Sequence, residues 1–440
     1  VSASAIQTAL GSADVEIQAD NDITVNQEID MYGGNWLTLT AGHDITINER
    51  IWGDGRGLTL TAGNDINVNY AMVIESNLEL NYGRQMTFGM DPVNGFIGMI
   101  GLVSESTISI NGISQTIIGN ATELQAMNEN LNGHYVLGDH IDLEEAPWTP
   151  IGSQADYNDY SLDFKGSFNG LGHTIANLSI EDDFTTQHDE GQAAGLFGNI
   201  AGATIAGVAL VDAYVNNTAL DGDNYIYAAS TGGLVGSARA LRDYSYAVIA
   251  TPTIHNNIVA FSNIAATGDE NGVGGIVGWA SDATISGNVV VNANVLSFNG
   301  GNVGGIAGGV DGSVISDSYV SNVTVGGLKG SAGGIVGGAY DSSRIIDSAV
   351  ETGVIHGWQN VGGIVGYLAD SSLAGSEPST VENSFYDREY TQIAAGEYDE
   401  VNNEYDFSGH FITLGAVDST QFGTWIAGGK TALSAESLLG

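Results

Sequence analysis

The chain has 440 residues, 43% of them apolar, and its 52 Asp plus Glu against 10 Lys plus Arg give a formal net charge of −42. A negative field of that size repels phosphate backbones and anionic lipid surfaces, so nucleic acid is excluded as an expected partner. The chain has no Cys, which excludes a thiol nucleophile and a thiolate metal site. No apolar run reaches the ~18 residues of a membrane helix, so direct membrane insertion is not expected.

Three aligned segments open the chain, VEIQADNDITVN from Val15, LTLTAGHDITIN from Leu37 and LTLTAGNDINVN from Leu58, at offsets of 22 and 21 residues. Each holds two short runs in which apolar and polar residues alternate, with a turn between them. Alternation predicts strands with one buried face. A period near 21 residues with several short strands is typical of one coil of a parallel β-helix, where stacked coils bury one another's inward residues.

The segment ATELQAMNEN, from Ala121 to Asn130, departs from this pattern because it consists of good helix formers. Leu124 and Met127 are spaced for one helix face, and Asn120 or Thr122 can serve as the N-cap. We therefore predict one short helix near residues 121–131, inserted into an otherwise all-β chain.

A second repeat fills the middle of the chain, with the core Gly-Leu/Ile-x-Gly at spacings of 38, 42, 30, 29 and 29 residues. The six copies begin at Gly195, Gly233, Gly275, Gly305, Gly334 and Gly363. The longer first intervals predict loops that leave a regular solenoid, at residues 221–231 and 238–252. The glycine pairs, such as Gly274 and Gly275, are expected to permit positive φ and close approach of successive coils. Small polar residues in the following strands are expected to turn the chain and stack between coils.

These repeats predict an all-β fold, a right-handed parallel β-helix, the handedness following the general preference of parallel crossovers. The expected organisation is residues 1–118 as the first set of coils, 119–185 as a junction with the short helix, 186–380 as the glycine-repeat coils and 381–440 as an irregular cap that shields the last coil.

The glycine repeats resemble the GLUG motif of large bacterial adhesins, and WTPIGS (148–153), FKGSFNGLGHTIANLSI (164–180) and NSFYDREYT (383–391) resemble the rest of that module. The LTLTAGxDIxxN repeats resemble filamentous-haemagglutinin-like stalks of two-partner-secreted proteins. The resemblance implies a secreted or bacterial cell-surface location, as part of a larger exported chain. It implies adhesion in a biofilm or on a host, with a polysaccharide or a surface receptor as the partner, and it transfers no catalytic residue.

Two alternatives from other classes stay open, a polysaccharide-degrading β-helix enzyme (lyase or glycoside hydrolase) and a purely structural spacer. Among 52 acids, some carboxylate pair will meet glycosidase spacing by chance. A lyase acting on uronic acids usually needs basic side chains or cations to offset the substrate charge, and Arg239 with Arg242 is the one close basic pair. We predict no enzyme activity and no catalytic residue.

Aromatic side chains are the expected sugar-binding groups, because their faces stack on pyranose rings. The residue after each Gly-x-x-Gly core is Asn199, Ser237, Trp279, Gly309, Gly338 and Tyr367 in turn. We therefore predict a shallow groove of Trp279, Tyr367 and, from a neighbouring turn, Trp358.

Calcium is the metal that the composition favours, since acidic turns offer hard oxygen ligands. Asp221 and Asp223 in the DGDN loop are the candidate ligands, and the HIDLEE turn at 140–145 is similar in composition. The eight His residues show no helical ligand spacing, so His43, His173 and the others are expected in turns or at the surface.

Overall fold

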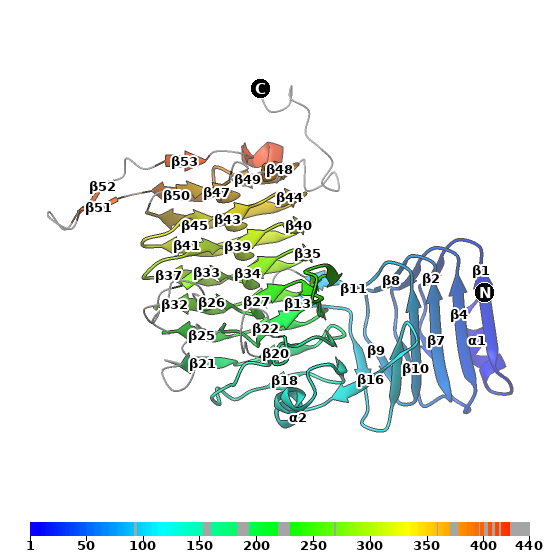
Figure 1. Cartoon of the computed structure of the whole chain (residues 1–440). Coiled ribbons are helices and arrows are strands. Elements are labelled where there is room, and N and C mark those ends of the chain that lie inside the picture. Colours follow the sequence, from blue (N-terminus) through cyan, green and yellow to red (C-terminus); the bar gives the residue numbers. More distant parts are fainter. Residues whose placement is uncertain are drawn as a thin grey trace. The chain divides into compact units, whose positions relative to one another are not determined.

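The computed structural model describes residues 1–91, 95–152, 160–182, 193–218, 229–267, 270–358, 360–369, 377–395, 397–399, 404–406, 410–412 and 415–422. The chain is all-β with large parallel sheets (Figure 1), which confirms that part of the prediction. It divides into two compact units. Unit 1 comprises residues 1–142, 166–175 and 205–209, and unit 2 comprises residues 143–165, 176–204 and 210–440. The bounds predicted at residues 118, 185 and 380 stay predictions.

In unit 1 the successive coils build three parallel ladders. The first ladder is β1 (Val15–Ala19), β4 (Trp36–Ala41), β7 (Gly57–Ala62), β10 (Asn77–Tyr82) and β15 (Thr107–Ile110). The second is β2 (Ile23–Val25), β5 (Ile45–Ile47), β8 (Asp65–Val68) and β11 (Gln85–Phe88), and the third is β3 (Ile29–Asp30), β6 (Ile51–Gly53), β9 (Met72–Ile74) and β14 (Ile100–Leu102). The register joins Leu37 to Leu58 and Leu58 to Leu78, so the inward residues of the repeats form one core.

The predicted short helix is confirmed as α2 (Ala121–Gln125), continued by the 3-10 turn η1 (Ala126–Glu129). The Asn120 side chain accepts a hydrogen bond from Glu123 N, and the Glu123 carboxylate accepts one from Gly119 N. This reciprocal capping fixes the start of the helix, and Leu124 and Met127 are buried. A second helix, α1 (Ala3–Leu10), was not predicted; it buries Ile6 and Leu10.

Before α2 the first sheet of unit 1 continues with β16 (Ile113–Ile118), which pairs antiparallel with β15, and after α2 it continues with the parallel strands β17 (His134–Leu137) and β19 (Ser167–Asn169). A small hairpin pairs β12 (Met90–Asp91) with β13 (Gly95–Phe96). Four strands lie where the chain passes from one unit to the other, namely β18 (Ile141–Asp142), β20 (Thr174–Ala176), β23 (Thr204–Ala206) and β24 (Ala209–Val211).

In unit 2 the glycine repeats build further parallel ladders, each strand paired with its equivalent about one repeat later (Figure 1). The ladder that carries the Gly-x-x-Gly cores is β22 (Phe197–Ala201), β27 (Val235–Arg239), β34 (Val277–Ser281), β39 (Ala307–Asp311), β43 (Val336–Tyr340) and β47 (Val365–Leu368). A second is β26 (Ala229–Gly232), β33 (Glu270–Gly274), β38 (Asn302–Gly304), β42 (Ala332–Gly333), β46 (Asn360–Gly362) and β53 (His410–Ile412). A third is β30 (Thr253–His255), β35 (Thr284–Ser286), β40 (Val314–Ser316), β44 (Arg344–Ile346) and β48 (Thr380–Glu382).

The largest sheet of unit 2 is made of two ladders that join in long strands. One contains β31 (Ile258–Ala260) and β36 (Val289–Val291), and the other contains β21 (Ser179–Asp182), β25 (Tyr214–Asn217), β32 (Asn263–Ala266) and β37 (Asn294–Ser297). Both pair with β41 (Tyr319–Gly327), which pairs with β45 (Ala349–Gly357), followed by β49 (Phe385–Asp387), β50 (Thr391–Ala395) and β54 (Ala416–Val417). Two hairpins are β28 (Leu241–Arg242) with β29 (Val248–Ala250) and β51 (Glu397–Asp399) with β52 (Glu404–Asp406).

The glycine pairs act through close packing, and the predicted positive φ is wrong for them. None of Gly274, Gly275 or their equivalents in the three following repeats has a left-handed backbone. A Cβ added at Gly275 would lie 2.3 Å from the carbonyl oxygen of Gly305 in the next coil, so only glycine fits there.

Small polar residues do stack between coils, as predicted. Buried serines form a ladder in which Ser318 N donates to Ser348 Oγ and Ser348 N donates to Ser384 Oγ, at 3.2 and 3.1 Å. The residue before each serine, such as Asp317 or Asp347, has a positive φ and turns the chain. The ladder satisfies backbone N–H groups that would otherwise be buried without partners.

No helix in the described ranges is both long and apolar enough to cross a membrane.

Candidate functional site

The predicted column of residues after the Gly-x-x-Gly cores is present in unit 2. The register joins Asn199, Ser237, Trp279, Gly309, Gly338 and Tyr367 in that order, on β22, β27, β34, β39, β43 and β47 (Figure 1). Sequence alignment of the motifs was sufficient to predict it because parallel strands of equal length repeat the same register in each coil.

A third aromatic residue, Tyr340, lies between the two that were predicted. Its ring stacks on Trp279 with a centroid distance of 5.8 Å and an interplanar angle of 26°. On its other side it contacts Tyr367 at 5.6 Å and 42°. We call Trp279, Tyr340 and Tyr367 the aromatic strip. Tyr340 was missed, although it stands two residues after the column position Gly338 and therefore on the same face of its strand.

The two glycines of the column provide the space in which these rings lie. A Cβ at Gly309 would lie 2.3 Å from the ring of Trp279, and a Cβ at Gly338 would lie 2.8 Å from the hydroxyl of Tyr340. The rings therefore lie against bare backbone, in the space that side chains at Gly309 and Gly338 would fill. Trp279 and Tyr340 are half-buried and Tyr367 is exposed, so the strip is partly accessible to a ligand.

Hydrogen bonds hold the rings of the strip in place. The Trp279 indole N–H donates to Ser281 Oγ at 3.1 Å, and the Asn302 amide donates to the Tyr340 hydroxyl at 3.0 Å. Burial, more than the opposing hydrogen bond from Asn302, raises the pKa of Tyr340, so its hydroxyl stays protonated at neutral pH. The strip is a pre-ordered surface of ring faces with a hydroxyl group at its centre.

Carboxylates lie on the strands beside the strip. Asp311 ends β39 in register with Ser281 and Tyr340. Burial, followed by the negative charges of Asp341 and Asp282, raises the pKa of Asp311. These groups accept hydrogen bonds from hydroxyl groups and repel anions.

Trp358 is not part of the strip. It lies in the bend after β45, on a different ladder, and in the described part of the chain no ring contact joins it to Trp279, Tyr340 or Tyr367. The structure therefore brings together two of the three predicted aromatic residues and replaces the third with Tyr340.

Both arginines of the one close basic pair in the sequence form ion pairs with aspartates of unit 2. Arg239 forms a buried ion pair with Asp163 at 2.8 Å and lies over the ring of Tyr160. Arg242 is paired with Asp282. Both guanidinium groups are therefore paired with carboxylates of the protein.

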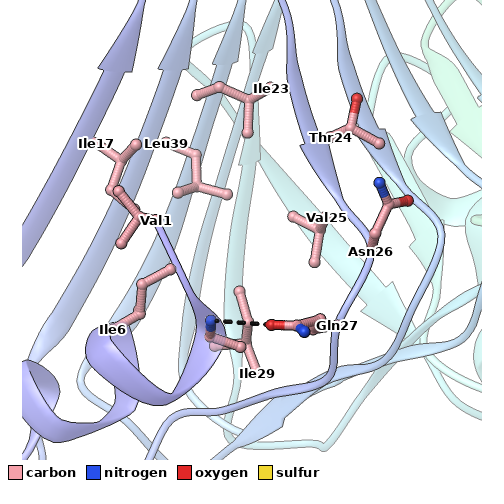
Figure 2. Close-up of a pocket in the computed structure, with 11 residues that line it drawn as sticks. Val1, Ile6, Ile17, Ile23, Thr24, Val25, Asn26, Gln27, Ile29 and Leu39 are labelled. Atoms are coloured by element: carbon pink, nitrogen blue, oxygen red, sulfur yellow. Dashed lines mark hydrogen bonds between the residues drawn. The ribbon is translucent and has the colours of Figure 1, made fainter.

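A cavity of about 480 Å³ lies at the first coil of unit 1, between α1 and the first strands (Figure 2). Its wall includes Ile6, Ile17, Ile23 and Leu39, and the Gln27 side chain accepts a hydrogen bond from Ala3 N. Most of the lining is apolar and belongs to the end of the core, since β1, β2 and β3 are the terminal strands of their sheets. It offers few polar groups that could orient a ligand.

The candidate calcium ligands Asp221 and Asp223 lie outside the described residues. Among described residues, one group has metal-ligand spacing, Asp139, His140 and His173 in unit 1. His173 closes the turn that begins at Gly170, in agreement with the expected turn position, and its side chain is buried, only 2% exposed.

No family model matches the chain, and no curated protein matches it. Two solved structures are similar to it. A crystal structure of a candidate immunoglobulin A1 protease from Bacteroides ovatus has a TM-score of 0.48 and 21% identity, covering 72% of this chain and 87% of that one. A structure named IgA1 protease has a TM-score of 0.45 and 16% identity, covering 72% of this chain and 24% of its own length. At these values the likenesses do not decide what chemistry this chain performs.

Proposed function

We propose that this chain is the binding segment of an extracellular bacterial surface adhesin, and that it holds a neutral polysaccharide against the aromatic strip without chemical turnover. The observation that carries the proposal is the continuous stack of Trp279, Tyr340 and Tyr367 over Gly309 and Gly338. Aromatic faces bury the apolar faces of sugar rings, while Tyr hydroxyl groups and nearby carboxylates form hydrogen bonds with the hydroxyl groups of the sugar.

The scaffold that we propose is a right-handed parallel β-helix. Ladders of equivalent strands recur at offsets of about 30 residues in unit 2, as in the pairs Trp279 with Gly309 and Val314 with Arg344. Parallel crossovers are right-handed in nearly all proteins. In such a scaffold each coil contacts only its neighbours, so a rigid strip forms across several coils without long-range contacts.

The charge of the protein favours an uncharged polymer. The chain carries a net charge of −42, and Asp282, Asp311 and Asp341 lie near the strip. A polyuronate would be repelled by this field, and Arg239 and Arg242 are paired with acids. We therefore place neutral glycans of a biofilm matrix or a host surface ahead of acidic ones, and ahead of a protein receptor.

Affinity electrophoresis in gels that contain a neutral β-glucan, a neutral mannan or a polyuronate tests the proposal. The wild-type chain is expected to be retarded by a neutral polymer and not by the polyuronate. Trp279→Ala is expected to weaken retention by about 10-fold, which corresponds to about 1.4 kcal/mol, because a stacked ring is lost.

Two controls separate the strip from general surface effects. Trp358→Ala removes a tryptophan outside the strip and is expected to leave retention unchanged. Tyr340→Phe preserves the ring and is expected to retain most of the binding. Absence of retention on all polymers, or an equal loss in Trp279→Ala and Trp358→Ala, would contradict the proposal, and a shortened polymer would show an enzyme instead.

A further inference from the structure

Asp139, His140 and His173 form a cluster in unit 1 in which one ligand atom of each residue lies within 4.8 Å of the others. His140 and His173 occupy equivalent positions in consecutive coils. The register joins His134 of β17 to Ser167 of β19, an offset of 33 residues, and the same offset separates His140 from His173. The two histidines are too far apart in the sequence to lie on one face of a helix. The stacking of two coils brings their imidazoles together.

The turn from Gly170 to His173 directs the His173 ring into the protein. Leu171 and Gly172 have φ values of 50° and 82°, and His173 N donates to the Gly170 carbonyl at 2.8 Å. Gly172 is required at its position, because a Cβ there would lie 2.3 Å from the carbonyl oxygen of Gly98. The His173 side chain is therefore buried, only 2% exposed.

The hydrogen bond of His173 determines its tautomer. Nε2 lies 2.9 Å from the Ile100 carbonyl oxygen, and since a carbonyl only accepts, Nε2 carries the proton. Nδ1 therefore has a free lone pair, and this buried atom has no hydrogen-bond partner. Burial lowers the pKa of His173 to about 4, so the ring is neutral at pH 7. A buried acceptor without a partner is costly unless something binds there.

His140 also has its lone pair on Nδ1, but there this atom has a hydrogen-bond partner. Its Nδ1 accepts a hydrogen bond from Thr174 N at 2.9 Å, so its Nδ1 lone pair faces the strand that follows His173. The two imidazole rings lie 5.0 Å apart at 80°. Asp139 completes the cluster, and its carboxylate accepts a hydrogen bond from the His140 backbone N at 2.7 Å. Both rings thus carry their lone pair on Nδ1, and a carboxylate lies beside them.

We propose that Asp139, His140 and His173 bind one divalent transition-metal ion of the zinc class, through the two Nδ1 atoms and the carboxylate. Two imidazoles and one carboxylate are a ligand set for such ions, and calcium and magnesium prefer oxygen ligands alone. The Ile100 carbonyl orients His173 as outer-shell acceptors orient metal-binding histidines elsewhere. On binding, the ion replaces the Thr174 N–H as the partner of the His140 Nδ1 lone pair. Water completes the coordination.

The proposed ion joins two consecutive coils at equivalent turns. A ligand that binds only the folded chain stabilises it, by about 2.7 kcal/mol when the free ion is at 100 times its dissociation constant. We therefore expect the ion to raise the melting temperature of the chain. This site lies apart from the aromatic strip in the sequence, and its occupancy is measured without any glycan.

Isothermal titration of the chelator-treated full chain with Zn²⁺, in excess Mg²⁺ to saturate general acidic surface sites, tests the proposal. One ion per chain is expected, with a rise in melting temperature. His140→Ala and Asp139→Asn are expected to weaken binding by about 10-fold or more, with unchanged circular dichroism, because each removes an exposed ligand.

His43→Ala is the matched control, since His43 is an exposed histidine followed by an aspartate in a similar turn of another coil. It is expected to bind Zn²⁺ as the wild type does. His173→Gln, which retains a polar group inside the turn, is expected to lose binding. No saturable binding, or an equal loss in His43→Ala and His140→Ala, would overturn the proposal.

Discussion

The indole ring of Trp279 stacks on the ring of Tyr340 at 5.8 Å and 26°, although the two residues belong to strands that are not neighbours in their ladder. The strand between them, β39, contributes Gly309 at this position, and the Trp279 ring occupies the space that a side chain would fill. The aromatic strip depends on this missing side chain as much as on the rings.

Gly309→Ala is therefore expected to disrupt the strip although it replaces none of its aromatic residues. Its Cβ would lie 2.3 Å from the Trp279 ring, which must move. Glycan retention should fall and the tryptophan fluorescence should shift. Gly101→Ala is the control, because its Cβ would have only ordinary contacts, at 3.7 Å. Unchanged retention in Gly309→Ala would show that the strip is not the binding surface.

Removal of one rung of the serine ladder is expected to destabilise unit 2. Ser348→Ala leaves the backbone N–H of Ser318 buried without its acceptor, which costs about 1 to 3 kcal/mol. Urea unfolding measures the change. Ser286→Ala, at a half-buried strand position outside the ladder, should change the unfolding free energy by less than about 0.5 kcal/mol. A loss as large as that of Ser348→Ala would show that the ladder is not the cause.

The buried ion pair of Arg239 and Asp163 should matter far more than an exposed pair of the same chemistry. The Arg239 and Asp163 side chains are 11% and 0% exposed. Arg239→Met leaves a buried carboxylate without its cation and should cost about 3 to 5 kcal/mol. Arg344→Met breaks a pair whose side chains are 50% and 48% exposed, and should cost at most about 1 kcal/mol. Similar losses in the two variants would contradict this account.

His255 should make folding sensitive to mild acid. Desolvation lowers its pKa from 6.5 to about 4 in the folded chain. Below pH 6.5 the unfolded chain gains a proton that the folded chain does not bind, so stability is complete above pH 6.5 and falls as the pH drops toward 4. Between pH 7 and 5 the unfolding free energy of His255→Gln should decline less than that of the wild type. Parallel curves would show that another group is responsible.

Much of this architecture was predictable because its determinants are local and repeated. Alternation around Leu37 and Leu39 predicted which side chains are buried, and the spacing of the Gly-x-x-Gly cores predicted that Trp279 and Tyr367 share a column. In a parallel ladder the register passes unchanged from coil to coil, so sequence offset converts directly into spatial position. The short helix after Asn120 was predictable for the same reason, since its cap and its buried face lie within ten residues.

What only the tertiary structure decided depends on how side chains lie between coils. Tyr340 enters the strip because its ring reaches back over Gly338, and Trp358 stays out because its bend belongs to another ladder. The pairing of His140 with His173 depends on an inward turn at Leu171 and Gly172 whose φ values alternation does not predict. Sequence periodicity determines which strand faces which, whereas the direction of a ring at a turn or over a glycine is set by the backbone that surrounds it.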